Sequence, residues 1–263
     1  MTKLSSVSFI GAGQVAWHLA PALDNAGWAV KEVYSRNPRH AEALTERLYQ
    51  GEVKASLDFS TSESRLFVMA VADDAMEAIA QEIILPEEAT LVHTSGSVPL
   101  EVLAFAAPAR SAVFYPLQTF TRAKRVDFKQ VPILIETADE QTWNELYVMA
   151  KAISTRVHRI DAKKRLALHV AAVFASNFTN HLLYASQRIL EAHDLPYDLI
   201  KPLIAETIQK SLDFGPEAAQ TGPARRGDLK TLDRHLAFLH EHPTQAELYR
   251  MLSQDILDQY RDE

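Results

Sequence analysis

Short apolar runs alternate with segments of helical length through the first half of the chain. The run Leu66–Ala72 is apolar at every position, which is typical of a strand buried on both faces of a sheet. A helical pattern over Gln14–Ala26 separates the first such run from the second. This alternation predicts βαβ units and a mostly parallel sheet. The other predicted strands are Val7–Ile10, Trp28–Tyr34, Leu91–His93, Val113–Tyr115, Pro132–Glu136 and Val157–Ile160.

The pattern becomes helical throughout at about Asp161. No glycine or proline interrupts Ala162–His193, which predicts one helix about 45 Å long at a rise of 1.5 Å per residue. Tyr197–Phe214 predicts a second helix, which Pro202 is expected to kink or bend. The remaining predicted elements are a loop over Gly215–Gly227 and helices over Asp228–His240 and Thr244–Tyr260.

Length and composition indicate a two-domain globular protein. The chain has 263 residues, and we predict an α/β fold: a doubly wound, mostly parallel sheet in residues 1–160, then an all-helical domain in residues 161–263. A net charge of −7 argues against a nucleic-acid partner. The absence of cysteine excludes disulfides and thiolate metal sites, and no other metal site is expected. Without a leader peptide or an apolar run of about 18 residues, we expect a cytoplasmic protein with no membrane contact.

The strongest motif follows the first predicted strand directly. Gly11-Ala12-Gly13-Gln14-Val15-Ala16 has the pattern GxGxxA between a strand and a helix. The first glycine permits a tight turn, the second lets the backbone approach a pyrophosphate, and the small Ala16 lets the helix pack closely. Free N–H groups at the helix start then face the phosphates. The motif predicts dinucleotide binding by Gly11, Gly13, Gln14 and Val15; the alternative is a tight turn that binds nothing.

The end of the second predicted strand indicates which dinucleotide is bound. NAD sites usually place an acidic residue there, on the ribose 2′-hydroxyl. Here Glu32 comes too early, and the strand ends in Ser35-Arg36-Asn37. A hydroxyl and a guanidinium suit a 2′-phosphate, so these three residues favour NADP over NAD. The alternative is that Arg36 is a solvated loop arginine.

Three further strand ends carry small or polar residues, and ligands of open α/β sheets bind beyond such ends. Val71 and Ala72 are candidate cofactor contacts. Asp73 and Asp74 are expected to cap the next helix, and the alternative is that they contact the substrate. His93, in the segment His93-Thr94-Ser95-Gly96-Ser97, is a candidate acid or base, or else a buried structural histidine. The third end is Tyr115-Pro116-Leu117-Gln118-Thr119-Phe120. Candidate substrate-orienting residues here are Ser95, which is also a candidate cofactor contact, and Gln118.

The helical half adds three candidates. His169 and Asn177 lie eight positions apart, on one stripe of an ideal helix together with Val173 and Asn180. Because asparagine has low helix propensity, these mid-helix asparagines are expected to bind a ligand, or else another helix or a dimer partner. Arg226 lies in a loop of glycine, proline and paired arginines, where it clamps an anionic substrate or is solvated.

The chain resembles a bacterial family in five of its motifs. These are the glycine motif, Ser35-Arg36-Asn37, His93–Ser97, Tyr115–Phe120 and Thr221–Asp228. That family joins a Rossmann-like NADP-binding domain to a helical domain of unknown function, and its members commonly carry the provisional name NADP oxidoreductase. More distantly, the arrangement is similar to pyrroline-5-carboxylate reductase and the β-hydroxyacid dehydrogenases. The latter carry a catalytic lysine four residues before an asparagine on the long helix; here Val173 and Ser176 take that position.

These observations predict an NADP(H)-dependent oxidoreductase. Hydride would pass between the nicotinamide and a small C=O or C=N substrate in a cleft between the domains. His93 or His169 would relay the proton, while Ser95, Gln118, Asn177 and Arg226 orient the substrate. An alternative of another class is a protein that senses NADP, or serves as a scaffold, without turnover.

A homodimer is also expected. The predicted long helix is apolar on several sides, so it needs partners on several sides. A second copy of the helical domain would supply them, since two-fold dimers are the commonest soluble assembly. The competing interpretation is a monomer.

Overall fold

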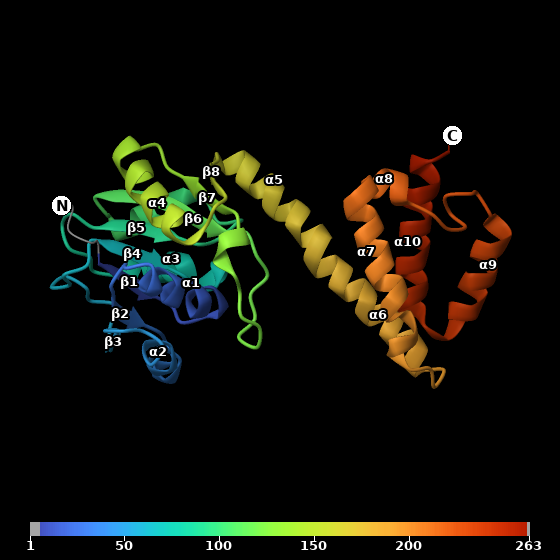
Figure 1. The fold of residues 1–263 in the computed structure, drawn as a ribbon, viewed down its shortest axis with the longest axis horizontal. Helices are drawn as coiled ribbons and strands as arrows, with labels where there is room; N and C mark the ends of the chain where they lie inside the picture. Colours follow the sequence, from blue (N-terminus) through green and yellow to red (C-terminus); the bar gives the residue numbers. More distant parts are fainter. Residues whose placement is uncertain (1–5, 262–263) are drawn as a thin grey trace. The chain divides into compact units, whose positions relative to one another are not determined.

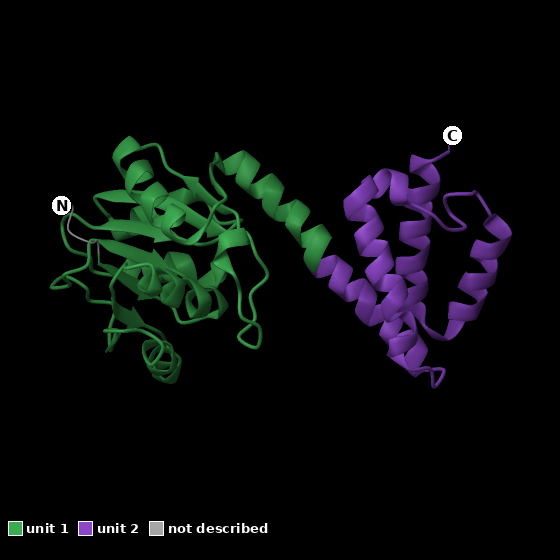
Figure 2. Cartoon of the chain, in the orientation of Figure 1, with its two compact units in different colours: residues 1–176 green, residues 177–263 purple. Residues whose placement is uncertain are grey.

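The computed structural model of the chain describes residues 6–261. The chain divides into two compact units, Met1–Ser176 and Asn177–Glu263 (Figure 2). The first holds a sheet covered by helices and the second is helical, as predicted (Figure 1). The last strand ends at Arg159, next to the predicted domain limit at residue 160, whereas the division between the units falls within the following helical segment. The domain limit stays a prediction.

All strands of the first unit join one sheet of eight, in the order β3-β2-β1-β4-β5-β6-β7-β8. Neighbouring strands run parallel, except that β6 and β7 are antiparallel. The chain order reverses between β1 and β4, which makes this the point where ligands of doubly wound sheets bind. The strands are β1 (Val7–Ile10), β2 (Val30–Tyr34), β3 (Glu52–Lys54), β4 (Leu66–Met69), β5 (Thr90–His93), β6 (Arg110–Pro116), β7 (Ile133–Glu136) and β8 (Val157–Arg159).

Helices cover both faces of this sheet, and the strands are apolar on both sides for that reason. In β4, Leu66 and Val68 join one core cluster, while Phe67 and Met69 join the other. Helices α1 (Gln14–Asn25), α2 (Pro38–Thr45) and α4 (Glu140–Ile153) pack on the first face. The second face is covered by α3 (Met76–Glu82) and the 3₁₀ segment η2 (Leu100–Ala106).

Every strand predicted from the apolar runs is present, with ends that differ by a few residues. Strand β3 was not predicted, because this edge strand has only three residues and none of them is buried. A strand so short and exposed leaves no hydrophobic pattern to recognise.

The predicted uninterrupted helix over Ala162–His193 is wrong in detail. The segment comprises α5 (Ala162–Ala172), a π-helical turn η4 (Val173–Phe178) and α6 (Thr179–Glu191). A π-helix bonds each residue to the fifth one along, which shifts the phase of every later side chain. Ideal α-helical spacing predicts that His169, Val173, Asn177 and Asn180 share one side of the helix. Because the π-helical turn lies among them, that spacing no longer holds at Asn177 and beyond.

The second unit contains the helices expected after residue 195, with two corrections. Pro202 does not kink a helix: a 3₁₀ turn (Tyr197–Ile200) comes first, and the proline lies in the first turn of α7, where its missing N–H has no cost. The predicted loop after Phe214 contains a short helix, α8. The helices here are α7 (Lys201–Phe214), α8 (Pro216–Ala219), α9 (Leu229–Phe238) and α10 (Pro243–Gln259).

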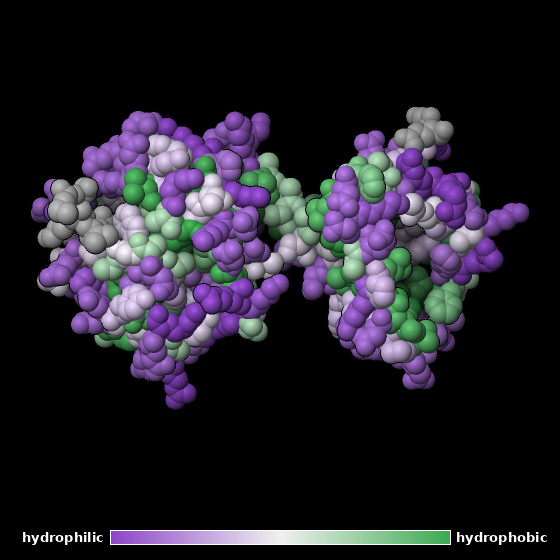
Figure 3. All heavy atoms as spheres, viewed as in Figure 1, coloured by the Kyte–Doolittle hydropathy of each residue, from purple (hydrophilic) through white to green (hydrophobic). Residues whose placement is uncertain are grey.

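Apolar side chains of the second unit are largely exposed. In its described part, only Ala224, Leu232 and Leu239 are buried among the hydrophobic residues. By contrast, Leu212 is 76% and Phe214 71% exposed. Figure 3 shows apolar surface on this unit as well as on the first. Within residues 6–261, no helix is long and apolar enough to cross a membrane.

Candidate functional site

The glycine turn after β1 is held between the ends of two neighbouring strands. The N–H of Gly11 donates to the carbonyl of Tyr34 at the end of β2, at 2.7 Å, and the N–H of Ala70 after β4 donates to Ile10, also at 2.7 Å. Gly11 has a φ of +106°, and a Cβ there would lie 2.3 Å from the carbonyl oxygen of Ala70. Only glycine fits this position, so the first glycine of the motif is required by the turn itself.

At Gly13, by contrast, neither the backbone conformation nor a close neighbouring atom requires glycine. It is the exposed N-cap of α1 with a negative φ, and a Cβ at this position would have the Ala70 oxygen as its nearest neighbour, at 3.8 Å. No side chain caps α1, and no acidic residue lies in its first turn. Space and unpaired N–H groups at a helix N-terminus suit a phosphate, so this turn fits the pyrophosphate of a dinucleotide. Gln14 is exposed and Val15 half-buried beside it.

The end of β2 leaves Arg36 exposed and Ser35 half-buried. Asn37 caps α2, its Oδ1 accepting the N–H of Arg39 at 3.2 Å. Glu32 faces elsewhere: it bonds Ser8 at 2.9 Å and pairs with Lys54 at 3.3 Å. Glu32 therefore does not place a carboxylate at the end of β2. Ser35 and Arg36, which lie there, fit a 2′-phosphate. Farther along the same edge, Val71 is half-buried and Ala72 exposed, both directly beyond β4.

His93 is fully buried at the end of β5. Its Nδ1 accepts the N–H of Ser95 at 3.2 Å, and its Nε2 has no hydrogen-bond partner among the described residues. Burial, with a smaller contribution from the nearby Arg165 cation, lowers the pKa of His93 to about 4. The imidazole therefore stays neutral near pH 7, which suits a residue that shapes the loop better than one that exchanges protons.

The serines of this loop bind Asp73. The hydroxyls of Ser95 and Ser97 donate to Asp73 Oδ2, at 3.0 and 2.5 Å. The Ser95 hydroxyl also accepts the N–H groups of Ser97 and Val98. The expectation that Asp73 caps the next helix is wrong, because the 3₁₀ turn there has no side-chain cap and the carboxylate is held by the serines across the sheet edge.

A tyrosine–histidine pair lies beside this loop. Tyr115, near the end of β6, shares a 3.0 Å hydrogen bond between its hydroxyl and Nδ1 of His169 on α5. A Cβ on Gly96 would lie 2.3 Å from that nitrogen and 2.7 Å from Cζ of Tyr115, so a glycine is needed for the pair to form. Burial raises the pKa of Tyr115, which keeps the phenol protonated. His169 was among the predicted site residues, whereas Tyr115 was predicted only as part of a strand-end motif.

Arg165, which the sequence analysis missed, anchors α5 on the same loop. Its Nε donates to Glu136 at 2.7 Å and its Nη1 to the carbonyl of Ser95 at 3.1 Å, and its side chain is 2% exposed. The sequence contains one indication that Arg165 belongs to the site: it precedes His169 by four residues, so both face the same side of the helix. Sequence spacing alone does not separate such an arginine from the exposed Lys163 and Lys164 next to it.

Three candidates remain. Gln118 is exposed, and its Oε1 accepts the N–H of Thr119 at 2.8 Å. Asn177 and Arg226 belong to the second unit and are exposed there. Their roles, like those of the other candidate residues, stay predictions. Among residues 6–261, no group of three or more histidines and carboxylates is placed to hold a metal ion.

The strand order and the glycine turn define a Rossmann-like α/β protein. A Rossmann-like domain model matches residues 2–117, and a model named Domain of unknown function (DUF2520) matches residues 131–256. A crystal structure from Bacteroides fragilis, provisionally named an NADP oxidoreductase, is 36% identical, with a TM-score of 0.88 over 97% of this chain and 98% of that one. The chain belongs to the family that joins these two domains.

Two more distant structures share the fold. A reductive aminase from Aspergillus terreus, in complex with NADPH and ethyl levulinate, is 16% identical, with a TM-score of 0.76 over 99% of this chain and 95% of that one. Prephenate dehydrogenase from A. aeolicus, in complex with hydroxyphenyl propionate and NAD⁺, is also 16% identical, with a TM-score of 0.59 over 99% of each chain. A comparison with functionally curated proteins finds no match.

Proposed function

We propose that this protein is an NADP(H)-dependent oxidoreductase that reduces a small C=O or C=N substrate, or oxidises the corresponding product. The proposal rests on one sheet edge with two parts. The first is an uncapped helix start at Gly13 beside Ser35 and Arg36, and the second is a partly buried hydroxyl–imidazole pair, Tyr115 and His169, at β6. The provisional name of the B. fragilis relative and the NADPH complex of the reductive aminase support it.

In this proposal, α1 and the glycine turn hold the pyrophosphate, and Ser35 and Arg36 hold the 2′-phosphate. When bound, the nicotinamide supplies or accepts the hydride. The protein supplies the proton: the Tyr115 hydroxyl donates it to the substrate oxygen or nitrogen, and His169, bonded to that hydroxyl, restores it. His93 and the Asp73–serine cluster keep the loop in shape around the pair.

The direct test is turnover. Purified protein with NADPH and a panel of small aldehydes, ketones and cyclic imines should consume NADPH only when a substrate is present, with one reduced product for each NADPH oxidised. Stoichiometric NADPH binding with no oxidation across the panel would instead favour a sensing or scaffold role. Identification by mass spectrometry of a metabolite that copurifies with the protein would narrow the panel.

Cofactor preference tests the role of Arg36. NADPH should bind more tightly than NADH, and Arg36→Ala should weaken NADPH binding by about 1.5–3 kcal/mol, the range for a hydrogen bond to a charged group. NADH affinity should hardly change, because NADH lacks the 2′-phosphate. Calorimetric titration measures both. Arg65→Ala, which removes another exposed arginine, is the matched control; equal affinities for the two cofactors in the unaltered protein would contradict the assignment.

Substitution of Tyr115 tests whether this residue donates the proton. With a carbonyl substrate, Tyr115→Phe should lower kcat by about 100-fold or more, the scale of general acid catalysis, and leave NADPH affinity unchanged. His169→Ala should lower kcat less, because the phenol remains. Steady-state kinetics and cofactor titration separate the two effects. Tyr147→Phe, at a half-exposed tyrosine of α4, is the control; a Tyr115→Phe enzyme with full kcat would remove the pair from the mechanism.

We further propose that the second unit pairs with a second copy of the chain. It buries too few apolar side chains to form a core of its own, and large exposed apolar surface marks interaction sites. Light scattering after size exclusion should give twice 29.4 kDa. Leu212→Glu on α7 should shift the protein toward monomer, whereas Glu206→Lys on the same helix should not. A mass near 29.4 kDa for the unaltered protein, with and without NADPH, would rule the dimer out.

A further inference from the structure

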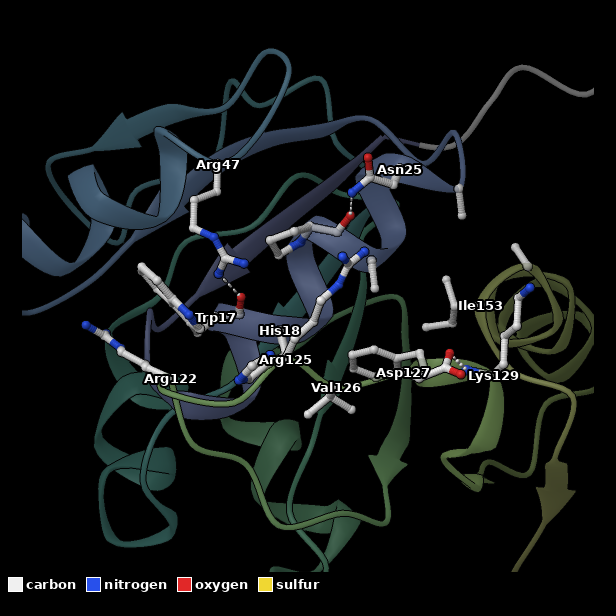
Figure 4. Close-up of a pocket in the computed structure, with 15 residues that line it drawn as sticks. Trp17, His18, Asn25, Arg47, Arg122, Arg125, Val126, Asp127, Lys129 and Ile153 are labelled. Carbon is white, nitrogen blue, oxygen red and sulfur yellow. Dashed lines mark hydrogen bonds between the residues drawn. The ribbon is translucent and has the colours of Figure 1, made fainter.

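A pocket of about 1050 Å³ lies along the side of α1, and one of its lining residues, Arg122, reaches the glycine turn at Ala12. Side chains reach it from α1, from the residues just after α2 and from the loop that follows β6 (Figure 4). Its apolar part is formed by Pro21, Ala22, Ala26, Val126, Phe128 and Ile153. A ligand in this pocket would therefore meet hydrocarbon as well as charge.

Four cations line the same pocket: Arg47, Arg122, Arg125 and Lys129. Within residues 6–261, no carboxylate lies within ion-pair distance of any of them. Asp127 is the one carboxylate in the lining, and its Oδ1 accepts the backbone N–H of Lys129 at 3.0 Å. In a chain whose net charge is −7, so many uncompensated cations around one cavity make a positive potential that selects anions.

Two of these arginines are already held in place. Arg47 donates to the carbonyl of Trp17, and Arg122 donates to the carbonyl of Ala12 at 2.8 Å. Their guanidinium groups lie 4.2 and 4.5 Å from the centre of the Trp17 ring. Burial, and then the Arg122 charge, lower the pKa of Arg47. Each guanidinium group is thus held by a backbone carbonyl and by the Trp17 ring, which fixes its position before any anion binds.

We propose that this pocket binds a small organic phosphate, as a second site distinct from the dinucleotide site. A phosphate group carries close to two charges and three acceptor oxygens, which several guanidinium and ammonium donors can share. The apolar lining takes the carbon skeleton. The side chains of Arg125 and Lys129 are exposed and form no ion pair within the described chain. Both are therefore available to bind the phosphate.

The test is calorimetric titration of the full-length protein with inorganic pyrophosphate. It is run on NADPH-saturated protein and on a Gly13→Val variant, so that no signal comes from the dinucleotide turn whether or not the proposed function holds. Saturable binding is expected in both. Arg125→Gln and Lys129→Gln should each weaken it about tenfold, the lower end of the range for a charge-assisted hydrogen bond.

Lys124→Gln is the matched control, because Lys124 lies in the same loop but does not line the pocket. It should leave the affinity unchanged. The proposal is overturned if pyrophosphate does not bind, if NADPH displaces it, or if the three variants weaken binding equally. Citrate binding more tightly than pyrophosphate would overturn the phosphate class in favour of carboxylates.

Discussion

A Gly13→Val variant should fold normally and lose NADPH binding. The structure leaves room for a Cβ at this position, so we expect the valine side chain to enter the volume that the pyrophosphate is proposed to occupy. Losing two hydrogen bonds to a charged group costs about 3–6 kcal/mol, which weakens binding by more than about 100-fold. Calorimetry measures the affinity, and thermal unfolding shows that the fold is intact.

Gly13→Ala is the graded control for this variant. A single methyl group meets only the Ala70 oxygen at 3.8 Å, so the alanine protein should be as stable and should lose less affinity. Gly11→Ala should behave in the opposite way and destabilise the fold, because its Cβ would overlap backbone atoms of Ala70. A stable Gly13→Val protein that binds NADPH with unchanged affinity would remove the phosphate site from this turn.

Arg165→Met should strongly destabilise the first unit. It leaves the Glu136 carboxylate, 12% exposed, without its partner, and breaking a buried pair on one side costs about 3–5 kcal/mol. The carbonyl of Ser95 also loses a donor. Urea unfolding, followed by a signal from the first unit, measures the loss.

Two variants make this result interpretable. Lys164→Met, one residue earlier, removes an exposed pair with Asp161 and should change stability by less than about 1 kcal/mol. The double variant Arg165→Met with Glu136→Leu should recover much of the loss, because replacing a whole buried pair by apolar side chains is often neutral. If Arg165→Met costs no more than Lys164→Met, the buried pair does not hold α5 in place.

The glycine turn could be predicted because all of its determinants are local. A strand, two glycines and a helix start follow one another within a few residues, and each residue type has its own steric reason. The strand ends that carry Ser35, Arg36, Val71 and Ala72 were found for the same reason: in a parallel sheet, all strand ends lie at one edge. The structure places these residues as expected, while their binding roles stay predictions.

The partners within the candidate active site could not be predicted. Ser95 bonds a carboxylate 22 residues away, Tyr115 a histidine 54 residues away, and Arg165 a carbonyl 70 residues away. No local pattern specifies such contacts. His93 shows the same limit in its pKa, because burial depends on every element around the ring rather than on its neighbours in the chain.

Most of the strands and helices, the two-part organisation and the position of the glycine turn could be predicted from the sequence alone. These follow from hydrophobic period and from backbone sterics, both of which act over a few residues. The antiparallel β7, the short edge strand β3 and the π-helical turn at Val173–Phe178 could not be predicted in this way. The tertiary structure alone decided which polar side chains meet, because burial and long-range contacts depend on how the elements pack against one another.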